Sequence, residues 1–115
     1  MNAIETVKKF MKAWKDREWS EMFRYTQKTW QSKEGNNPSL LASWFGPKNL
    51  TKTKIIDEHK ISDCCVDITL KINYLFILNL KEVKIKARVI CETDPYKPDP
   101  MGTWGVNPLS ILREF

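Results

Sequence analysis

Asp57 and His59 stand two residues apart and form the clearest candidate for acid–base chemistry in this sequence. Alternate side chains of an extended strand point to the same face, so the carboxylate could orient the imidazole as a general base. Tyr74, in a later segment, could donate a hydrogen bond to a carbonyl group. These residues would suit a small lyase or isomerase that acts on an apolar carbonyl substrate. The alternative is a solvated pair on an edge strand, and the pattern of residues 50–61 leaves that choice open.

The three cysteines do not form a disulfide framework, because their number is odd and Cys64 and Cys65 are adjacent. No Cys-x-x-Cys occurs and His59 is the only histidine, so we expect no metal and no cofactor. Cys64 and Cys91 share a predicted inward face, but counting back from a turn near residues 79–81 leaves them several residues out of register. We interpret them as small buried side chains in a reducing cytoplasm, with a trimmed secreted precursor as the alternative.

The net charge of +5 and the sequence pI of about 9.2 favour an anionic partner only weakly, because 19 basic and 14 acidic residues are interspersed. We therefore expect no nucleic acid. No apolar run approaches the ~18 residues of a transmembrane helix, so we expect no membrane partner. A basic row on one strand face could bind phosphate, although a solvated sheet surface offset by Asp67 and Glu92 explains it as well. That row consists of Lys71, Lys84, Lys86 and Arg88, with Lys52 and Lys54 beside it.

The first third of the chain predicts helices. An apolar stripe with helical spacing runs from Ala3 to Trp14, and Asn2 is placed to cap its first turn. A second stripe spans residues 19–30, and a short third helix should begin near Pro38 and end at Gly46.

From residue 50 onward the apolar period changes to two, which is typical of strands. Strands are predicted over residues 50–61, 64–76 and 83–92, the last two joined by the short turn near residues 79–81. A final strand should span residues 104–111, with a bulge at Asn107-Pro108.

This order predicts one α+β domain over residues 1–115, with N-terminal helices packed in a curved antiparallel sheet. Apolar residues occupy one face of the strands and charged residues the other, so we expect helices on one face and water on the other. Five apolar residues break the polar face and favour a homodimer through the sheet. They are Leu75, Ile77, Leu78, Ile90 and Leu112.

The arrangement resembles the nuclear transport factor 2-like superfamily, a cystatin-like α+β cone that is also found in ketosteroid isomerases and SnoaL-like cyclases. The resemblance rests on the helix ETVKKFMKAWKDREW, the short helix SLLASWF, the strands ITLKINY and VKIKARVIC, and the ending GTWGVNPLSILR. It implies a pocket between helices and sheet that aromatic side chains line. The candidates are Trp14, Tyr25, Trp30, Trp44, Phe45, Tyr74 and Trp104.

A ketosteroid-type isomerase needs a carboxylate base inside an apolar pocket. The predicted inward positions of the two longest strands carry no Asp or Glu, because Asp67 and Glu92 fall on the opposite face. We therefore expect a domain that binds a small apolar ligand or assembles with protein through an aromatic pocket. The lyase or isomerase with Asp57, His59 and Tyr74 is the alternative.

Overall fold

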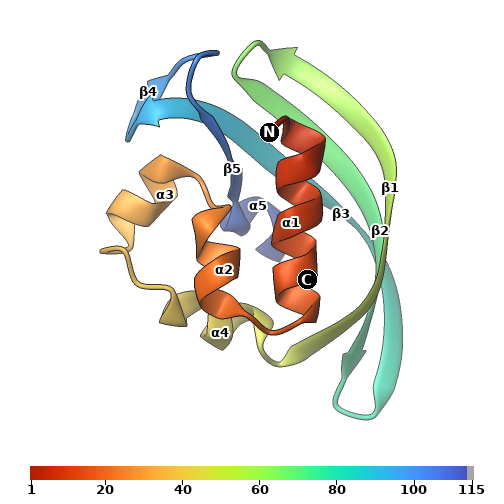
Figure 1. The fold of residues 1–115 in the computed structure, drawn as a ribbon. Helices are drawn as coiled ribbons and strands as arrows, with labels where there is room; N and C mark the ends of the chain where they lie inside the picture. The colour runs from red at the N-terminus through yellow and green to blue at the C-terminus, as the bar shows by residue number, and fades with distance from the viewer. Residues whose placement is uncertain (114–115) are drawn as a thin grey trace.

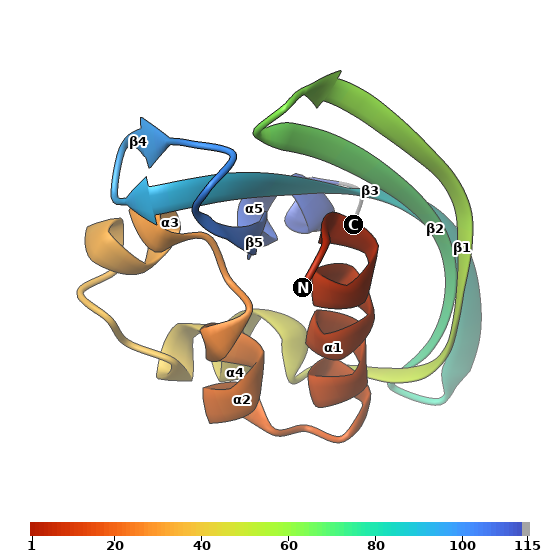
Figure 2. The same cartoon turned by 45° about the horizontal axis from the view of Figure 1, so that its top comes forward.

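The computed structural model describes residues 1–113 as helices held within a curved antiparallel sheet (Figure 1). Figure 2 shows α1 inside the curve that β1 and β2 make. The chain order, helices before strands, confirms the predicted α+β class. The elements are α1 (Ala3–Lys15), α2 (Trp19–Arg24), α3 (Lys28–Lys33), α4 (Ser39–Phe45), β1 (Lys48–Ser62), β2 (Cys65–Phe76), β3 (Asn79–Asp94), β4 (Lys97–Pro98), β5 (Thr103–Asn107) and α5 (Pro108–Leu112).

Helix α1 provides the inner surface against which the sheet curves. Its cap is the predicted one, since Asn2 Oδ1 accepts a hydrogen bond from the Glu5 amide at 2.9 Å. The side chains of its apolar stripe, including Phe10 and Trp14, are fully buried. The indole of Trp14 packs edge-on against Phe45 of α4 with ring centroids 4.9 Å apart, so α1 and α4 share one core with the sheet.

The sheet has the strand order β1-β2-β3-β4, and β5 pairs with β3 as well. Every pairing between these strands is antiparallel. Alternation is clean along β2 and β3, where the inward side chains from Ile68 to Tyr74 and from Ile85 to Val89 are buried. Strand β1 is interrupted by register shifts at three places and is mostly exposed. The two central strands therefore form the sheet's side of the core.

The turn between β2 and β3 lies at Ile77 and Leu78, where Phe76 pairs with Asn79. The predicted turn near residues 79–81 was wrong because Ile-Leu carries none of the residue types that normally mark a turn. With the turn at Ile77 and Leu78, each residue of β2 faces a different partner on β3 from the one that the predicted turn implied. Cys64 then lies opposite Cys91, whose amide donates to the Cys64 carbonyl at 2.8 Å, instead of several residues out of register.

The predicted helix over residues 19–30 is split into α2 and α3 by β5. The amide of Gln27 donates to the Val106 carbonyl at 2.8 Å, and the amide of Val106 donates to the Tyr25 carbonyl at 2.8 Å. The Tyr25 carbonyl and the Gln27 amide therefore bond to β5 instead of to a continuous helix. The close approach depends on Gly105, where an added Cβ would lie 2.5 Å from the Thr26 carbonyl oxygen.

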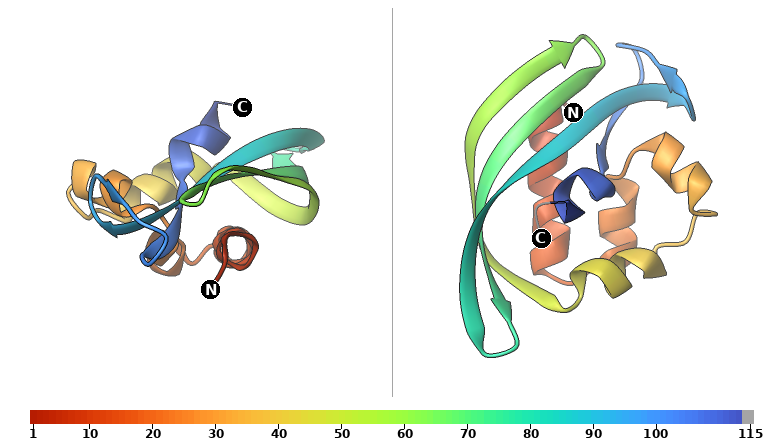
Figure 3. Two further views of the ribbon diagram at one scale, coloured as in Figure 1. Left: turned by 90° about the horizontal axis from the view of Figure 1, so that it is seen from above. Right: turned by 180° about the vertical axis from the view of Figure 1, so that it is seen from behind.

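The predicted final strand over residues 104–111 was also wrong beyond Asn107. Asn107 Oδ1 accepts from the Leu109 amide at 3.1 Å and caps α5, and Pro108 occupies the first turn. The Asn107-Pro108 pair, which was predicted to form a bulge, is therefore the start of a helix. Figure 3 places α5 on the side of the sheet opposite α1. The outer face is consequently covered in part, which corrects the expectation that helices cover one face only.

The N-terminus of α3 is capped from a distant strand. Its N-cap residue, Gln27, makes no side-chain capping bond. The buried carboxylate of Glu92 on β3 accepts from the Thr29 amide at 3.1 Å and also from the Thr29 hydroxyl. A carboxylate at this position matches the positive end of the helix dipole, so Glu92 ties α3 to the end of the sheet.

We expect Gly105→Ala to lower the free energy of unfolding by about 3 kcal/mol, because the new methyl group meets backbone atoms that cannot move aside. Gly35→Ala is the control: its φ of +63° disfavours alanine, but the surrounding space is open, so about 1 kcal/mol is expected. Urea denaturation measures both. Equal losses would contradict the close contact between β5 and residues 26–27.

Candidate functional site

A row of polar residues crosses the outer face of the sheet. His59 of β1 pairs with Asp67 of β2, Asp67 with Arg88 of β3, and Arg88 with Asn107 at the end of β5. Directly opposed residues have Cβ atoms about 5 Å apart and share a face. The register thus brings an imidazole, a carboxylate, a guanidinium and an amide into one line.

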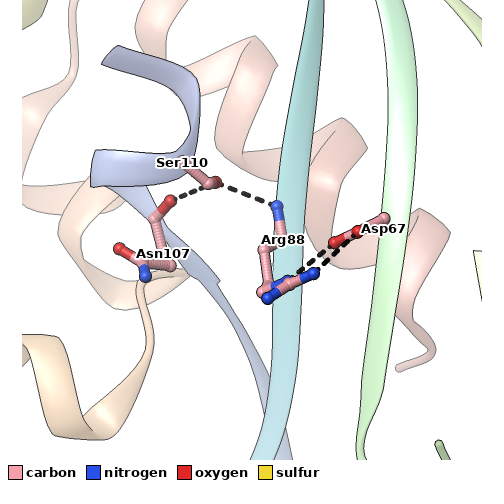
Figure 4. A network of polar contacts seen from close by, with 4 residues as sticks. All are labelled: Asp67, Arg88, Asn107 and Ser110. Carbon is pink, nitrogen blue, oxygen red and sulfur yellow. Dashed lines mark hydrogen bonds and ion pairs between the residues drawn. The ribbon is translucent and has the colours of Figure 1, made fainter. Parts of the chain in front are cut away.

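The ion pair between Arg88 and Asp67 fixes the centre of this row (Figure 4). The Nε and Nη2 atoms of Arg88 donate to Oδ1 and Oδ2 of Asp67 at 2.9 and 3.0 Å. This fork geometry holds the guanidinium plane in one orientation. The hydrogen bonds from Arg88 lower the pKa of Asp67 and outweigh the opposing effect of its burial, and the charges of Lys86 and His59 act in the same direction.

Helix α5 is anchored at the same place by Ser110. The Ser110 hydroxyl accepts from the Arg88 amide at 2.9 Å and donates to the Asn107 carbonyl at 2.6 Å (Figure 4). One side chain therefore satisfies a backbone donor of β3 and a backbone acceptor at the start of α5. The helix is held beside Arg88 without covering it.

An open hollow of about 240 Å³ lies between α5 and the part of the row from Asp67 to Asn107. Three cations and one carboxylate line it, together with Asn107 and Ser110; the charged residues are Asp67, Lys86, Arg88 and Arg113. The side chain of Asp67 is 8% exposed and that of Arg88 is 46% exposed, so the cation is the accessible partner. Pockets for drug-sized ligands occupy about 300–1,000 Å³. The hollow is therefore suited to a single anionic group, such as a carboxylate or a phosphate.

The three predicted catalytic residues do not meet. Asp57 and His59 pair with Thr69 and Asp67, which places them on the outer face. Tyr74 is buried on the inner face. The direction of Asp57 and His59 depends on the register shift between Ile55 and Asp57, and a bulge of this kind leaves no trace in a pattern of alternation. The sheet itself separates the proposed donor from the proposed acid–base pair.

Four of the predicted pocket aromatics belong to one buried core cluster, and the other three are partly buried and pack against it. Trp14 and Phe45 pack together in the core, and Trp30 packs against Trp44 with ring centroids 6.0 Å apart. Tyr25 lies in a hollow between α1 and α2 and donates to Glu21, and Trp104 lies in another hollow near Asn2. Tyr74 belongs to the core cluster. Trp14, Trp30, Phe45 and Tyr74 therefore fill the core, which is the ordinary role of large aromatic side chains in a small domain.

Within residues 1–113, no cluster of three or more His, Cys, Asp or Glu side chains is placed to hold a metal ion. No helix in that part of the chain is long and apolar enough to cross a membrane.

Sequence reasoning anticipated part of the site and missed the rest. It expected Asp67 and Glu92 to offset the basic row through cross-strand pairs. The Asp67–Arg88 ion pair confirms this for Asp67, whereas Glu92 is buried and bonds Thr29 instead. It missed Asn107, Ser110 and Arg113. The signal was the Asn-Pro pair at residues 107–108, which marks a helix start as readily as a bulge.

A similar fold occurs in a SEC-C motif containing protein from Psychrobacter arcticus, whose crystal structure matches with a TM-score of 0.70. The match covers 95% of this chain and 60% of the other, so this chain spans less than two thirds of that protein's length. The sequence identity is 11%, and likeness at this level shows the fold alone. No family model matches the chain. A search of curated proteins found no match.

The resemblance to the nuclear transport factor 2-like superfamily was wrong as an identification. No family model supports it, and a SEC-C motif containing protein is a similar solved structure. The quoted segments carry helical and strand periodicity, which many α+β proteins share, and no residue combination particular to that superfamily. The cystatin-like assignment was wrong for the same reason. The structure does confirm the α+β class, with a five-stranded antiparallel sheet.

We expect Asp67→Asn to lower the free energy of unfolding at neutral pH by about 1 kcal/mol, a modest value because Arg88 is partly solvated. The folded pKa of Asp67 is lowered, so its contribution is complete above about pH 5 and is lost as the pH falls below 3.8 toward the folded value. Urea denaturation between pH 7 and pH 2 should show the two proteins converging in acid.

The control is Asp94→Asn at an exposed position, which should change stability by less than about 0.5 kcal/mol at neutral pH. A difference between wild type and Asp67→Asn that stays constant down to pH 2 would contradict the lowered pKa.

Proposed function

We propose that this chain is a binding domain without catalytic activity, and that the hollow beside α5 receives an anionic group of a small molecule or a partner protein. The observation that carries the proposal is the fixed guanidinium of Arg88. Its bonds to Asp67 use Nε and Nη2. The Nη1 atom then remains to bind a carboxylate or phosphate oxygen.

The charges around Arg88 support an anion. Lys86 and Arg113 line the same hollow, and Asp67 is its one carboxylate. Because Asp67 is buried and already accepts two hydrogen bonds from Arg88, its repulsion of a ligand is reduced. An arginine that is oriented before binding also loses less side-chain entropy when it meets a ligand.

The separation of the acid–base candidates supports a non-catalytic role. A lyase or isomerase needs its base and its hydrogen-bond donor within reach of one substrate. His59 and Asp57 face outward, whereas Tyr74 faces the core. We therefore favour binding over the lyase or isomerase.

A reducing compartment such as the cytoplasm is part of this proposal. All three cysteines are free thiols, and burial raises the pKa values of Cys65 and Cys91. Raised pKa values keep the thiols protonated and slow their oxidation.

The test is a heteronuclear NMR titration with inorganic phosphate and, separately, with succinate. The amides of Arg88, Ser110 and Arg113 should shift, and the affinity should fall with added salt. The double variant Lys86→Gln/Arg113→Gln should weaken binding at least about tenfold, because two attractive charges beside the anion are lost.

Lys8→Gln/Lys9→Gln on α1 removes the same charge on the opposite side of the sheet and should leave the affinity within about twofold. Equal weakening by both double variants would show diffuse attraction and defeat the proposal, as would the absence of shifts around the hollow.

A further inference from the structure

The hairpin that joins β2 and β3 ends in an exposed apolar tip. It projects beyond the helices in two opposite views (Figures 1 and 3). Ile77 is 73% exposed, Leu78 92% and Leu80 67%, and Leu75, which pairs with Leu80, is 38% exposed. We call these four residues the apolar tip. Apolar side chains gathered at one projecting point mark a contact site.

The backbone at the apolar tip is strained. Ile77 has a φ of +51°, in the left-handed region that a β-branched residue rarely adopts. Two-residue hairpin loops normally place Gly, Asn or Asp at such a position. The chain thus carries isoleucine where glycine would give a more stable turn, and strain of this kind concentrates at functional positions.

A row of three lysines crosses the outer face near the apolar tip. Lys54 of β1 pairs with Lys71 of β2, and Lys71 pairs with Lys84 of β3. Glu82 contacts Lys71 at 3.1 Å and compensates one of the three charges. Like charges directly opposite one another destabilise a sheet. Folding therefore gives no reason for this row, whereas an anionic surface does.

We propose that the apolar tip and the lysine row dock this protein on an anionic lipid surface. Leu75 and Leu80 lie four residues, roughly 13 Å, from Lys71 and Lys84 along their strands. Ile77 and Leu78 form the turn beyond Leu75 and Leu80 and are the outermost residues of the hairpin. Interfacial segments bury their apolar side chains about 5–10 Å into the headgroup region. Leu75 and Leu80 share the outer face with the lysine row, so a hairpin that lies tilted with this face toward the membrane brings the lysine side chains to the lipid phosphates.

Shape and charge favour lipid over a second copy of the chain. Standard protein interfaces use about 20–30 residues on each side, and the apolar tip has four. Two copies meeting through this face would also oppose their lysine rows. The sequence predicted no membrane partner because no apolar run is long enough to span a bilayer, but contact with the surface needs only a few apolar side chains.

The experiment is co-sedimentation with vesicles of pure phosphatidylcholine and with vesicles that contain 30% phosphatidylserine. Binding to the anionic vesicles should be reversible, with an association constant on the order of 10⁴ M⁻¹, as for a single acyl chain. High salt should release the protein. The variant Ile77→Gly/Leu78→Ser should bind at least tenfold more weakly and melt at the same or a higher temperature, because glycine accepts the positive φ.

The charge contribution is tested with Lys54→Gln/Lys84→Gln, which should weaken binding about fivefold for each lysine. Lys8→Gln/Lys9→Gln is the matched control and should bind within about twofold of the wild type. Failure to bind anionic vesicles, or equal binding by the tip variant, overturns the proposal. It is also overturned if sedimentation velocity shows a dimer that the tip variant abolishes while vesicle binding is unchanged. None of these three results bears on anion binding beside α5.

Discussion

The pairing of Phe76 with Asn79 sets the register on which the rest of the sheet depends. From this pair inward, each residue of β2 has one partner on β3, and alternation decides which side chains face α1. A slip by one residue would turn Ile68, Leu70 and Ile72 to solvent and bring lysines into the core. The same register opposes Asp67 to Arg88 and Lys71 to Lys84. Core and surface are thus fixed by one turn.

The two faces of the sheet differ in composition and in what they contact. The inner side is filled by aromatic and aliphatic packing around Trp14 and Phe45, which gives the fold its stability. The outer side carries the groups assigned to the two proposed binding regions: the lysine row, the oriented Arg88 and the apolar tip. Lys84 and Lys86 lie on the same face of β3 and connect the two proposed binding regions. A ligand bound beside α5 and an anionic surface at the tip would therefore share one basic face.

Periodicity predicted α1, the short helix α4 and the long strands, because each has a pattern that one buried face imposes. It could not find the turn at Ile77 and Leu78, whose residues break the usual turn chemistry. It could not divide residues 19–30 into two helices, because the cause is β5, which lies about eighty positions away in the sequence. The direction of Asp57 and His59 stayed open because strand bulges are invisible in sequence. The anion site depends on α5, which the strand prediction concealed.

The cap that Glu92 gives to α3 constrains the order in which the chain folds. A helix of six residues does not persist alone in water. Its capping carboxylate arrives only when β3 is in place, 63 residues further along the chain. Strand β5, whose bonds to residues 25 and 27 end α2 and start α3, comes later still. Helix α1, which has 13 residues and a local cap from Asn2, can therefore form early, whereas α3 must wait for the C-terminal half, so α3 should join the structure after the sheet has assembled.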